Sequence, residues 1–563
     1  MKISVKAWMK TGQPWVWLTG GAVALNVIMV AGLLTLIAVR GLGHFWPADV
    51  LQAEYLEQNG TVSQIVGEVA DTKKDHANQL REAGVEVPEG VEFVRRDLLK
   101  MGNRDVTGRD FRWVMASRLQ GIDYPEQLFV SERSEWGNFY GYLRQLKQQD
   151  EILGSFEPGQ ETARYEELWN ELQLRIERAD AISDQINAIE KHEIGAINVK
   201  FERLRLQTRR LQLDDSFTPE NQADIAAEQE ALDLQYDGLQ QRLIELYGQI
   251  GRDSLVAEVA GGRQLEIPLS KIVQAYRPNA MSIPEKMLFY CAKLWEFLSE
   301  EPREANTEGG VFPAIFGTVM MVLLMAILVT PFGIIAAVYL REYATQGPVT
   351  RLIRIAVNNL AGVPSIVYGV FGLGFFIYFL GGNIDQLFFP AALPSPTFGT
   401  PGLLWASLTL ALLTLPVVIV ATEEGLARIP RSLREGSLAL GATKAETLWK
   451  VVLPMASPAM MTGVILAVAR AAGEVAPLML VGVVKLAPSL PVDGNYPFVH
   501  LDQKFMHLGF HIYDVGFQSP NVEAARPLVY ATALLLVVVI VLLNLSAVAI
   551  RNRLREKYKA LEH

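Results

Sequence analysis

Apolar side chains are concentrated in six long stretches of the chain, separated by polar segments of very different lengths. A helix that crosses a bilayer needs roughly 20 mostly apolar residues. The stretches that meet this length lie at about 15–39, 313–340, 355–381, 402–422, 458–484 and 527–550. The pattern therefore predicts a polytopic α-helical membrane protein with six transmembrane helices.

Residues 41–311 form one long polar insertion after the first predicted span. Within it, apolar side chains recur at spacings of three, four or seven over residues 160–250, which is typical of helices that pack along one stripe. The register slips near Gly195, as at a coiled-coil stutter. Thr218 followed by Pro219 is a typical helix start. Residues 160–250 are therefore predicted to form an antiparallel coiled-coil hairpin, about 50 Å long at a rise of about 1.5 Å per residue.

The rest of the insertion has strand-like patterns at Val62–Val69, Val91–Ser117 and Leu255–Leu269. We therefore expect an inserted α+β domain that bears the hairpin. Two roles are open: a spacer or oligomerisation element, or a docking surface for another protein. The histidines His76 and His192 are scattered, which argues against a metal site.

Basic residues predict the orientation of the spans. With the N-terminus inside, Lys and Arg gather in the inner segments, whereas the outer loops at about 382–401 and 485–526 hold few. The first stretch is too long for a cleaved signal and lacks an Ala-x-Ala site, so we expect an uncleaved anchor. The predicted order is a cytoplasmic N-terminus at 1–14, the first transmembrane helix at 15–40, an extracytoplasmic insertion at 41–311, a transmembrane domain at 312–550 and a basic cytoplasmic tail at 551–563. The inner cations are Lys2, Lys6, Lys10, Arg341, Arg351, Arg354, Arg428, Arg431, Arg434, Lys444, Lys450, Arg551, Arg553, Arg555, Lys557 and Lys559.

Composition adds little to this picture. The chain of 563 residues exceeds one ordinary domain. Its net charge of −10 is uninformative, because a membrane constrains charge locally rather than in sum. With one cysteine, Cys291, an intramolecular disulfide is excluded, and oxidising and reducing compartments both stay open.

A polar segment at about 424–455 separates two of the apolar stretches and contains EGSLALGATKAETLWKVVLP. Glu435 is followed by two small residues, three others, Gly441, nine more and then Val-Val-Leu-Pro. This spacing resembles the "EAA" loop of ABC importer permeases, which reads Glu-Ala-Ala, three residues, Gly, nine residues, Ile-x-Leu-Pro. The resemblance implies a short helix–turn–helix that docks on an ATPase subunit, with Gly441 in the turn and Leu453-Pro454 ending the second helix. The alternative is an amphipathic helix held to lipid headgroups by its cations.

The loop departs from the family pattern at Gly436 and Ser437, where alanines are usual. Both residues are small, so close packing on an ATPase stays feasible. Gly weakens a helix by up to about 1 kcal/mol.

Arg470 and Glu474 lie in the fifth predicted span, four residues apart, which places both on one helical face. A charge at bilayer depth is tolerated when it is paired or lines a water-filled path. The planar guanidinium fork of Arg matches phosphate and other tetrahedral oxyanions. One interpretation is a neutral pair that fastens two helices. The other is a guanidinium in a translocation path, with Glu474 keeping an anion from binding too tightly.

The residues around this pair, ARAAGEVAPL, resemble a motif of permease subunits of the phosphate-specific ABC importer. The stretch Asn358–Gly369 resembles the family's "vPSIvyG" segment, and Thr330–Leu340 resembles its second-span ending. The similarity covers about residues 310–550 and best fits the A-type membrane subunit, which pairs with a related second permease. It implies type I ABC importer permease architecture and leaves the insertion unaccounted for.

The resemblance also implies partners and a location. We expect a second homologous permease, a dimer of ATPase subunits, a periplasmic phosphate-binding protein and the lipid bilayer, but no nucleic acid. The sequence lacks a Gly-x-x-x-x-Gly-Lys-[Ser/Thr] loop. ATP and Mg²⁺ are therefore expected on a partner chain, so that this chain binds no cofactor or metal and is not an enzyme. The expected location is a bacterial inner membrane, with both termini cytoplasmic and the insertion in the periplasm.

Five further residues are candidates for hinges or for the path. Pro331 and Pro364 each remove a backbone hydrogen bond, as at a packing kink or a gating hinge. Asn358, Asn359 and Ser365 either bond neighbouring helices or lie along the path, and the first reading is preferred.

Three functions compete at this point. The first is ATP-driven phosphate import, with sulfate as a competing oxyanion. The second is a degenerate permease that acts as a phosphate sensor or scaffold. The third is a secondary transporter with Glu474 as proton carrier, against which the EAA-type loop argues.

Overall fold

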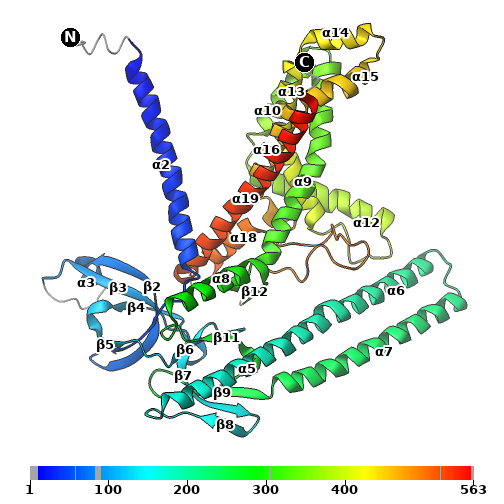
Figure 1. Ribbon diagram of the computed structural model, residues 1–563. Helices are drawn as coiled ribbons and strands as arrows, with labels where there is room; N and C mark the ends of the chain where they lie inside the picture. The colour runs from blue at the N-terminus through cyan, green and yellow to red at the C-terminus, as the bar shows by residue number, and fades with distance from the viewer. Residues whose placement is uncertain (1–10, 58, 83–89, 304–305, 520–521, 560–563) are drawn as a thin grey trace, which may run out of the picture.

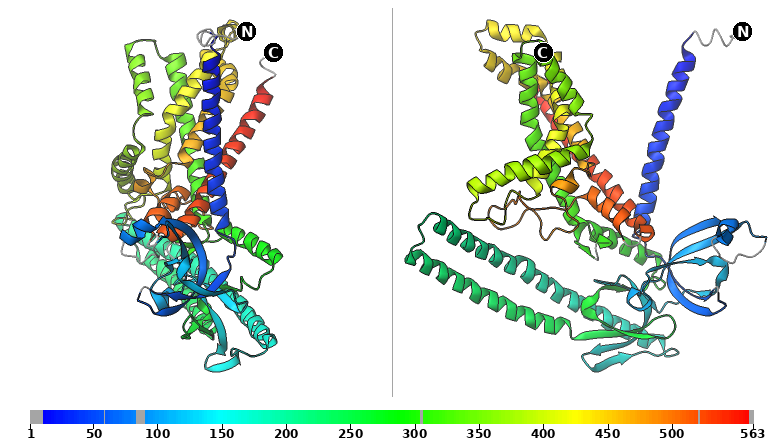
Figure 2. Two further views of the ribbon diagram at one scale, coloured as in Figure 1. Left: turned by 90° about the vertical axis from the view of Figure 1, so that its left-hand side faces the viewer. Right: turned by 180° about the vertical axis from the view of Figure 1, so that it is seen from behind.

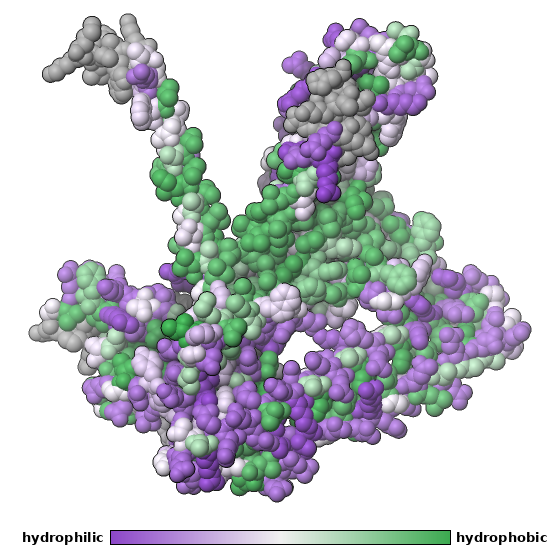
Figure 3. All heavy atoms as spheres, viewed as in Figure 1, coloured by the Kyte–Doolittle hydropathy of each residue, from purple (hydrophilic) through white to green (hydrophobic). Residues whose placement is uncertain are grey.

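The computed structural model describes residues 11–57, 59–82, 90–303, 306–519 and 522–559. A bundle of long helices is joined at one end to a polar part that contains all the longer strands and a helical arm (Figures 1 and 2). Hydrophobic side chains dominate the bundle and the separate N-terminal helix, whereas the polar part is mostly hydrophilic (Figure 3). Six helices of the described chain are long and apolar enough to cross a membrane: Gln13–Gly43, Phe312–Tyr343, Ser365–Phe388, Leu403–Arg428, Lys444–Ala472 and Ala525–Arg553.

The number of spans agrees with the sequence prediction. Lys2, Lys6 and Lys10 lie outside the described residues, as does the end of the predicted tail at 551–563. The predicted orientation and the predicted domain boundaries therefore stay predictions.

Helix α13 (Leu403–Arg428) lies at the centre of the bundle, between α9 (Phe312–Val338) and α16 (Leu453–Ala472). Their contact is close, since a Cβ added to Gly463 of α16 would lie 2.7 Å from Ala421 of α13. Small residues favour helix association in membranes, where close packing rather than the hydrophobic effect drives it. The bundle is extended by a wide-turn segment η5 (Tyr339–Tyr343) after α9, and by α18 (Leu508–Tyr513), η8 (Asp514–Gln518) and α19 (Val522–Lys559).

The third predicted span, at 355–381, is wrong as a single helix. Helix α10 (Pro348–Leu360) ends first, and a new helix begins at Ser365. Pro364 has no N–H and disfavours helical conformation in the residue before it, so the helix cannot run through this point. The apolar span is built from α11 (Ser365–Phe371), η6 (Gly372–Gly381) and α12 (Gly382–Phe388).

The fifth predicted span, at 458–484, is wrong at both ends. The helix begins at Lys444 as α15 (Lys444–Thr447) and continues through η7 (Leu448–Val452) into α16. It ends at Ala472, and a short helix α17 (Leu478–Val481) follows. The wide turn of η7 directly precedes Pro454, where the missing N–H and the proline ring would disturb a regular helix. The helix therefore continues through Pro454 instead of ending there.

The N-terminal helix α2 (Gln13–Gly43) stands apart from the bundle along most of its length (Figure 1). It touches the bundle at its C-terminal end, where Gly41 is buried and lies so close to α19 that a Cβ would come within 2.8 Å of the Ala531 backbone nitrogen. The remaining side chains of α2 are mostly exposed, so an apolar environment must surround them.

The polar part contains two antiparallel sheets. The first has the strand order β4-β3-β2-β1-β5, and the second has the order β10-β9-β7-β6-β11, with β8 paired to β7. Hairpin β9–β10 turns at Gly261 and Gly262, both with positive φ, within the stretch Leu255–Leu269 where the sequence predicts strands. The strands are β1 (Val50–Leu56), β2 (Val62–His76), β3 (Phe93–Lys100), β4 (Phe111–Met115), β5 (Leu119–Asp123), β6 (Leu128–Arg133), β7 (Phe139–Gln148), β8 (Glu151–Ser155), β9 (Asp253–Glu258), β10 (Gln264–Pro268) and β11 (Ile272–Tyr276).

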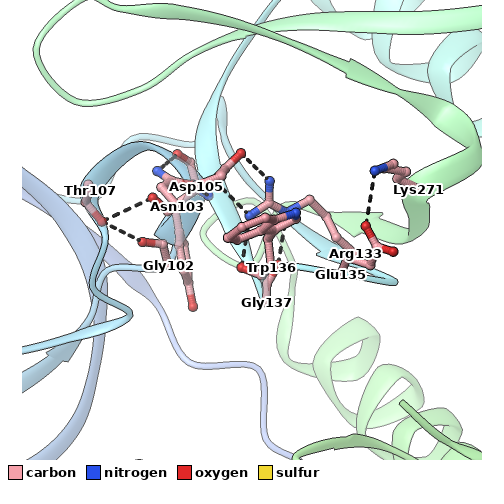
Figure 4. A network of polar contacts seen from close by, with 10 residues as sticks. Gly102, Asn103, Asp105, Thr107, Arg133, Glu135, Trp136, Gly137 and Lys271 are labelled. Atoms are coloured by element: carbon pink, nitrogen blue, oxygen red, sulfur yellow. Dashed lines mark hydrogen bonds and ion pairs between the residues drawn. The ribbon is translucent and has the colours of Figure 1, made fainter. Parts of the chain in front are cut away.

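A polar network holds the two sheets together (Figure 4). The Asn103 side chain, after β3, donates to the Tyr140 carbonyl of β7 and accepts from the Tyr140 N–H, both at 2.9 Å. The guanidinium of Arg133 on β6 bonds both oxygens of Asp105, at 2.9 and 3.1 Å. Arg133 also donates to the carbonyl of Gly137 at 3.0 Å. Because these groups are largely buried, the two sheets are fixed to one another.

The second sheet carries an arm of two antiparallel helical segments (Figures 1 and 2). One comprises α5 (Thr162–Asn187), η2 (Ala188–Ile194) and α6 (Gly195–Leu213), and the other is α7 (Pro219–Ile250). The π-helical turn η2 explains the register slip near Gly195, because each wide turn shifts the stripe that follows it. Arg203 on α6 donates to the Tyr496 carbonyl of the membrane domain at 2.8 Å. The arm therefore lies along the end of the bundle, while its coiled-coil character stays a prediction.

The segment between the arm and the bundle contains helix α8 (Ile283–Ser299) and a short hairpin of β12 (Pro302–Arg303) and β13 (Glu308–Gly309). Short elements in the first sheet's loops are α3 (Ala77–Glu82), α4 (Arg104–Thr107) and η1 (Ala116–Arg118), and η3 (Leu269–Lys271) joins β10 to β11.

Candidate functional site

The segment that resembles an EAA loop forms two short helices at the end of the bundle remote from the sheets (Figure 1). The first is α14 (Arg431–Ala439), and the second is α15, which continues into α16; we call residues 431–447 the α14–α15 hairpin. Gly441 has a φ of 88°, the left-handed conformation that a tight turn requires and that Gly adopts without strain. Thr443 caps α15 through its hydroxyl, which accepts from the Glu446 N–H at 3.3 Å. Local sequence therefore determines the shape of the hairpin.

The hairpin is attached to the end of α9 through Arg434. Its guanidinium lies 2.9 Å from a carboxylate oxygen of Glu342, and it donates to the carbonyls of Leu426 and Ile429 at 2.8 and 2.9 Å. Lys444 in addition contacts the backbone carbonyl of Glu342. Two residues of the hairpin are therefore bonded to η5, the helical segment that continues α9.

The two helices of the hairpin are joined by their side chains as well. The hydroxyls of Ser437 and Thr447 lie 2.9 Å apart and share a hydrogen bond. Ser437 stands where the family pattern has its second alanine. Its hydroxyl therefore gives the hairpin a contact that alanine would not make.

The outer surface of the hairpin is open. Every residue of α14 is exposed or half-buried, and Glu435 is exposed. A Cβ added to Gly436 would meet no described atom within 4 Å. Leu440 is 91% exposed, and Trp449 on the following helical turn is 74% exposed. Large apolar side chains in such a position are typical of a protein interaction surface.

The predicted role of Leu453-Pro454 as a helix boundary is wrong. Both residues lie inside the continuous helix that runs from Lys444 to Ala472. A helix of this length spans about 43 Å at about 1.5 Å per residue. The second helix of the hairpin is therefore the first part of a membrane-spanning rod.

Arg470 lies in the last turn of that rod, and not near its middle as the predicted span implied. Helix α16 ends two residues later, and the chain bends at Gly473, so Glu474 lies beyond the helix instead of on its face. The Arg470 Nε and the nearer Glu474 oxygen are 3.6 Å apart, and the side chains are 34% and 21% exposed. We call residues 470–477 the elbow. It brings a cation and an anion together at a helix end while leaving both accessible.

Helix α11 supports the elbow from one side. A Cβ added to Gly369 would lie 2.7 Å from the Cα of Pro477, so the two backbones are in direct contact. Tyr368 on the same helix donates a hydrogen bond from its hydroxyl to the Leu360 carbonyl at 2.6 Å. The two sequence motifs that suggested a phosphate permease therefore pack against each other.

The other predicted path residues are dispersed. Ser365 and Pro364 begin α11, and Pro331 lies inside α9, which stays helical around it. Asn358 and Asn359 lie on α10, and Asn358 lines a cavity of about 130 Å³ near the hairpin end of α13. The structure therefore does not place the asparagines at the elbow.

That cavity contains an ion pair which the sequence did not reveal. The Nε of Arg354 on α10 lies 3.1 Å from a carboxylate oxygen of Glu423 on α13. Arg354 also donates to the Leu340 carbonyl at 3.1 Å. The sequence used Arg354 only as a marker of orientation, because its partner lies 69 residues away. Within the described parts of the chain, no group of three or more His, Cys, Asp or Glu side chains is placed to hold a metal.

Part of the chain is similar in sequence to known transport proteins. Residues 329–556 match the family described as binding-protein-dependent transport system inner membrane component. A phosphate transport system permease protein PstA 1 of Mycobacterium tuberculosis is 38% identical over 248 residues, which cover 43% of this chain and 71% of the relative. A probable phosphate transport system permease protein PstA of Methanocaldococcus jannaschii is 30% identical over 221 residues, covering 38% and 67%.

Among solved structures, an inward-facing MetNI methionine ABC transporter covers 49% of this chain and 99% of its own, at 19% identity and a TM-score of 0.33. This score is too low to support an argument.

The match of residues 329–556 identifies the membrane domain as a binding-protein-dependent transport permease. By its similarity to the Mycobacterium tuberculosis relative, the chain belongs to the family of phosphate transport system permeases of the PstA type.

Proposed function

We propose that this chain is the membrane permease subunit of an ATP-driven phosphate importer. It forms the translocation path with a second permease and is driven through the α14–α15 hairpin. The observation that carries the proposal is the continuous helix from Lys444 to Ala472, which has the hairpin at one end and Arg470 at the other. An ATPase that engages the hairpin would move the rod and Arg470 as one body.

The hairpin supplies the surface on which an ATPase pair would act. Leu440 and Trp449 offer apolar area to the partner, while Arg434 fixes the hairpin to α9 through Glu342. Glu435, Gly436, Ser437 and Gly441 keep the coupling roles that the family resemblance implies. ATP and Mg²⁺ would be bound by the partner, so this chain contributes motion and no catalysis.

The elbow supplies chemistry suited to a tetrahedral oxyanion. The guanidinium of Arg470 presents planar donors that match phosphate. Broken helices at membrane depth commonly line substrate paths, because water or neighbouring groups there satisfy the freed backbone. Glu474 competes for the same guanidinium at 3.6 Å, which would keep a bound anion from being held too tightly to leave.

The same proposal includes the source of phosphate, the location of the chain and its second permease. Phosphate would arrive from a periplasmic binding protein, with the sheets and the arm in the periplasm of a bacterial inner membrane and both termini in the cytoplasm. The predicted six-span type I arrangement and the second permease complete the assembly. Such a neighbour would also cover apolar surface that this chain leaves exposed within the membrane, as on α2.

Uptake of radiolabelled phosphate tests the proposal. Cells lacking the chain are complemented with wild type, Arg470→Gln, Gly441→Asp or, as a control, Arg209→Gln on the exposed surface of the arm. Loss of a buried or half-buried charged contact costs about 2 kcal/mol or more, which is more than about tenfold in affinity. We expect Arg470→Gln and Gly441→Asp to lose uptake at normal membrane levels and Arg209→Gln to retain it.

The same cells separate the alternatives. A sensor or scaffold would retain uptake with both Arg470→Gln and Gly441→Asp. A secondary transporter would take up phosphate without an ATPase and stop when the proton gradient collapses. Competition by sulfate would identify a broader oxyanion path.

A further inference from the structure

Helix α8, between the arm and the membrane domain, has two very different faces. All four of its charged side chains, Glu285, Lys286, Lys293 and Glu296, lie within about 100° of one another at about 100° per residue. The opposite face is formed by apolar residues. Met287, Leu288 and Trp295 on that face are 59%, 73% and 70% exposed, and Cys291 between them is exposed.

The charged face is clamped to the sheets. The Nζ of Lys293 lies 2.6 Å from a carboxylate oxygen of Glu132 on β6 and 2.6 Å from Glu296. Lys286 contacts Asp49 just before β1. Burial alone would raise the pKa of Glu132, but the charge and hydrogen bond of Lys293, together with the charges of Arg303 and Lys100, hold this pKa below its ordinary value. Since this face is fixed, the apolar face must point away from the sheets.

Three contacts place α8 at the level where the spanning helices end. Trp46, three residues after α2, lies 6.1 Å from the ring of Tyr290, and Phe45 lies 5.0 Å from the ring of Phe297. Phe297 also belongs to the apolar cluster that contains Ala314 at the start of α9. α8 lies crosswise to α2 at this level (Figures 1 and 2).

We propose that α8 is an interfacial helix whose Met287–Trp295 face lies in the lipid leaflet on the insertion's side of the membrane. The apolar face of α8 would contact lipid at the depth where headgroups meet acyl chains. Amphipathic helices with large apolar residues on one side lie in this plane, and tryptophan is favoured at this depth. The same helix contacts residues at the ends of α2 and α9 through Tyr290 and Phe297, so its exposed face lies at the level of two spanning helices, which argues for lipid as its occupant. All the charges of α8 lie on the clamped side, so acyl-chain contact rather than headgroup charge would hold it.

This anchor has a structural consequence. Because α8 is bonded to Asp49, just before β1, and to Glu132 on β6, and leads through β12–β13 into α9, it would fix the height of both sheets above the membrane. The arm extends from the second sheet, so its position along the bundle is set by the same anchor. The inference rests on α2 and α9 crossing a membrane, and it does not depend on which anion is transported.

The chain offers a native probe for the test. Cys291 is its one cysteine and lies on the apolar face. An environment-sensitive fluorophore is attached there in the full chain, assembled with its partner subunits in phosphatidylcholine vesicles. Quenching by phospholipids that carry a nitroxide on the upper acyl chain is compared with quenching by aqueous iodide. The matched controls are Cys291→Ser chains with Leu33→Cys in α2 or Leu234→Cys on the arm, both at exposed positions.

We expect the label at Cys291 to be quenched by the lipid nitroxide about as strongly as the label in α2. We also expect iodide to quench it at least roughly threefold less than the label on the arm, as for a residue buried at the interface. Leu288→Glu should lower the lipid quenching, whereas Leu234→Glu should leave it unchanged.

Two results would overturn the inference. Iodide quenching equal to that on the arm would place the face in water. Protection from both quenchers would mean that a protein covers it. Neither result bears on phosphate transport, since the measurement needs no substrate or ATP.

Discussion

The α14–α15 hairpin and the elbow at residues 470–477 lie at the two ends of one helix, yet they are stabilised in different ways. The hairpin is surface-exposed and obtains its shape from its own residues, namely the turn at Gly441 and the cap at Thr443. The elbow is formed where α11 packs backbone to backbone against Pro477. One region is locally encoded, and the other depends on tertiary contact.

This difference suits the two proposed roles. A docking hairpin must keep its shape while partners exchange at its surface, and local bonds provide that independence. A substrate site must change with the packing of the bundle, and an elbow held by α11 responds when that packing changes. Under the proposed function, the helix between them would convert a movement at the surface into a movement at Arg470.

The largest effect is expected from crowding the elbow. In Gly369→Val the new side chain would meet the backbone of Pro477, because a Cβ at this position already lies 2.7 Å from its Cα. Overpacking of this kind costs about 1–3 kcal/mol. We expect a lower midpoint of thermal unfolding for the purified chain and a loss of phosphate uptake.

Gly374→Val is the matched control, since it lies in the same span and its Cβ would meet no described atom within 4 Å. It should leave both stability and uptake close to wild type. Equal behaviour of the two variants would show that contact with α11 does not hold the elbow.

The difference between locally encoded structure and structure held by tertiary contacts also separates what the sequence could predict from what it could not. The turn at Gly441 follows from the family resemblance and the number of spans from hydropathy, and both agree with the structure. The third and fifth spans were misplaced because hydropathy does not reveal where a helix breaks inside an apolar stretch. At Pro364 the helix breaks because proline lacks an N–H, and α16 ends at Ala472, directly before Gly473, inside an apolar stretch that hydropathy treats as continuous.

Ion pairs between residues far apart in the chain could not be predicted from the sequence either. Arg434–Glu342 and Arg354–Glu423 join residues 92 and 69 positions apart, and their members looked like ordinary inner-loop charges. Leu453-Pro454 was misread because proline usually ends a helix, whereas the wide turn η7 accommodates it. The family motif identified the correct region but assigned it the wrong helix boundary.

The next largest effect is expected where the hairpin meets α9. Arg434→Met removes the partner of Glu342, whose side chain is 13% exposed, and leaves a mostly buried carboxylate unpaired at a cost of about 1–3 kcal/mol. We expect ATP hydrolysis by the assembled transporter to continue while uptake falls, because the hairpin no longer moves α9.

Lys450→Met is the control for this pair. Lys450 lies 3.8 Å from Glu446, and their side chains are 77% and 50% exposed, so the loss should be below about 0.5 kcal/mol. A double-mutant cycle of Arg434→Met with Glu342→Gln measures the coupling directly. A coupling near zero would contradict the proposed transmission to α9.

A smaller effect is expected inside the hairpin, where replacing one glycine by alanine should lower the stability and replacing another should raise it. Gly441→Ala places a Cβ at a φ of 88° and should cost about 1–2 kcal/mol. Gly436→Ala lies within α14, where Ala stabilises a helix by about 0.5–1 kcal/mol relative to Gly. Thermal unfolding of the purified chain compares them. A loss at both positions would contradict this prediction, because Gly436 would then need to lack a side chain even within the purified chain.

The smallest effect is expected from the cap of α15. Thr443→Ala removes the hydroxyl that accepts from the Glu446 N–H and bonds the Glu446 carboxylate at 2.9 Å, at a cost of about 1 kcal/mol. Thr218→Ala removes the same kind of cap from α7 in the arm, where the hydroxyl accepts from the Asn221 N–H at 3.3 Å. Both variants should lose similar stability, but only Thr443→Ala should weaken binding of the ATPase subunits to the purified chain. Equal ATPase binding by the two would mean that the hairpin does not need its local bonds to dock, and the contrast with the elbow would then lose its functional meaning.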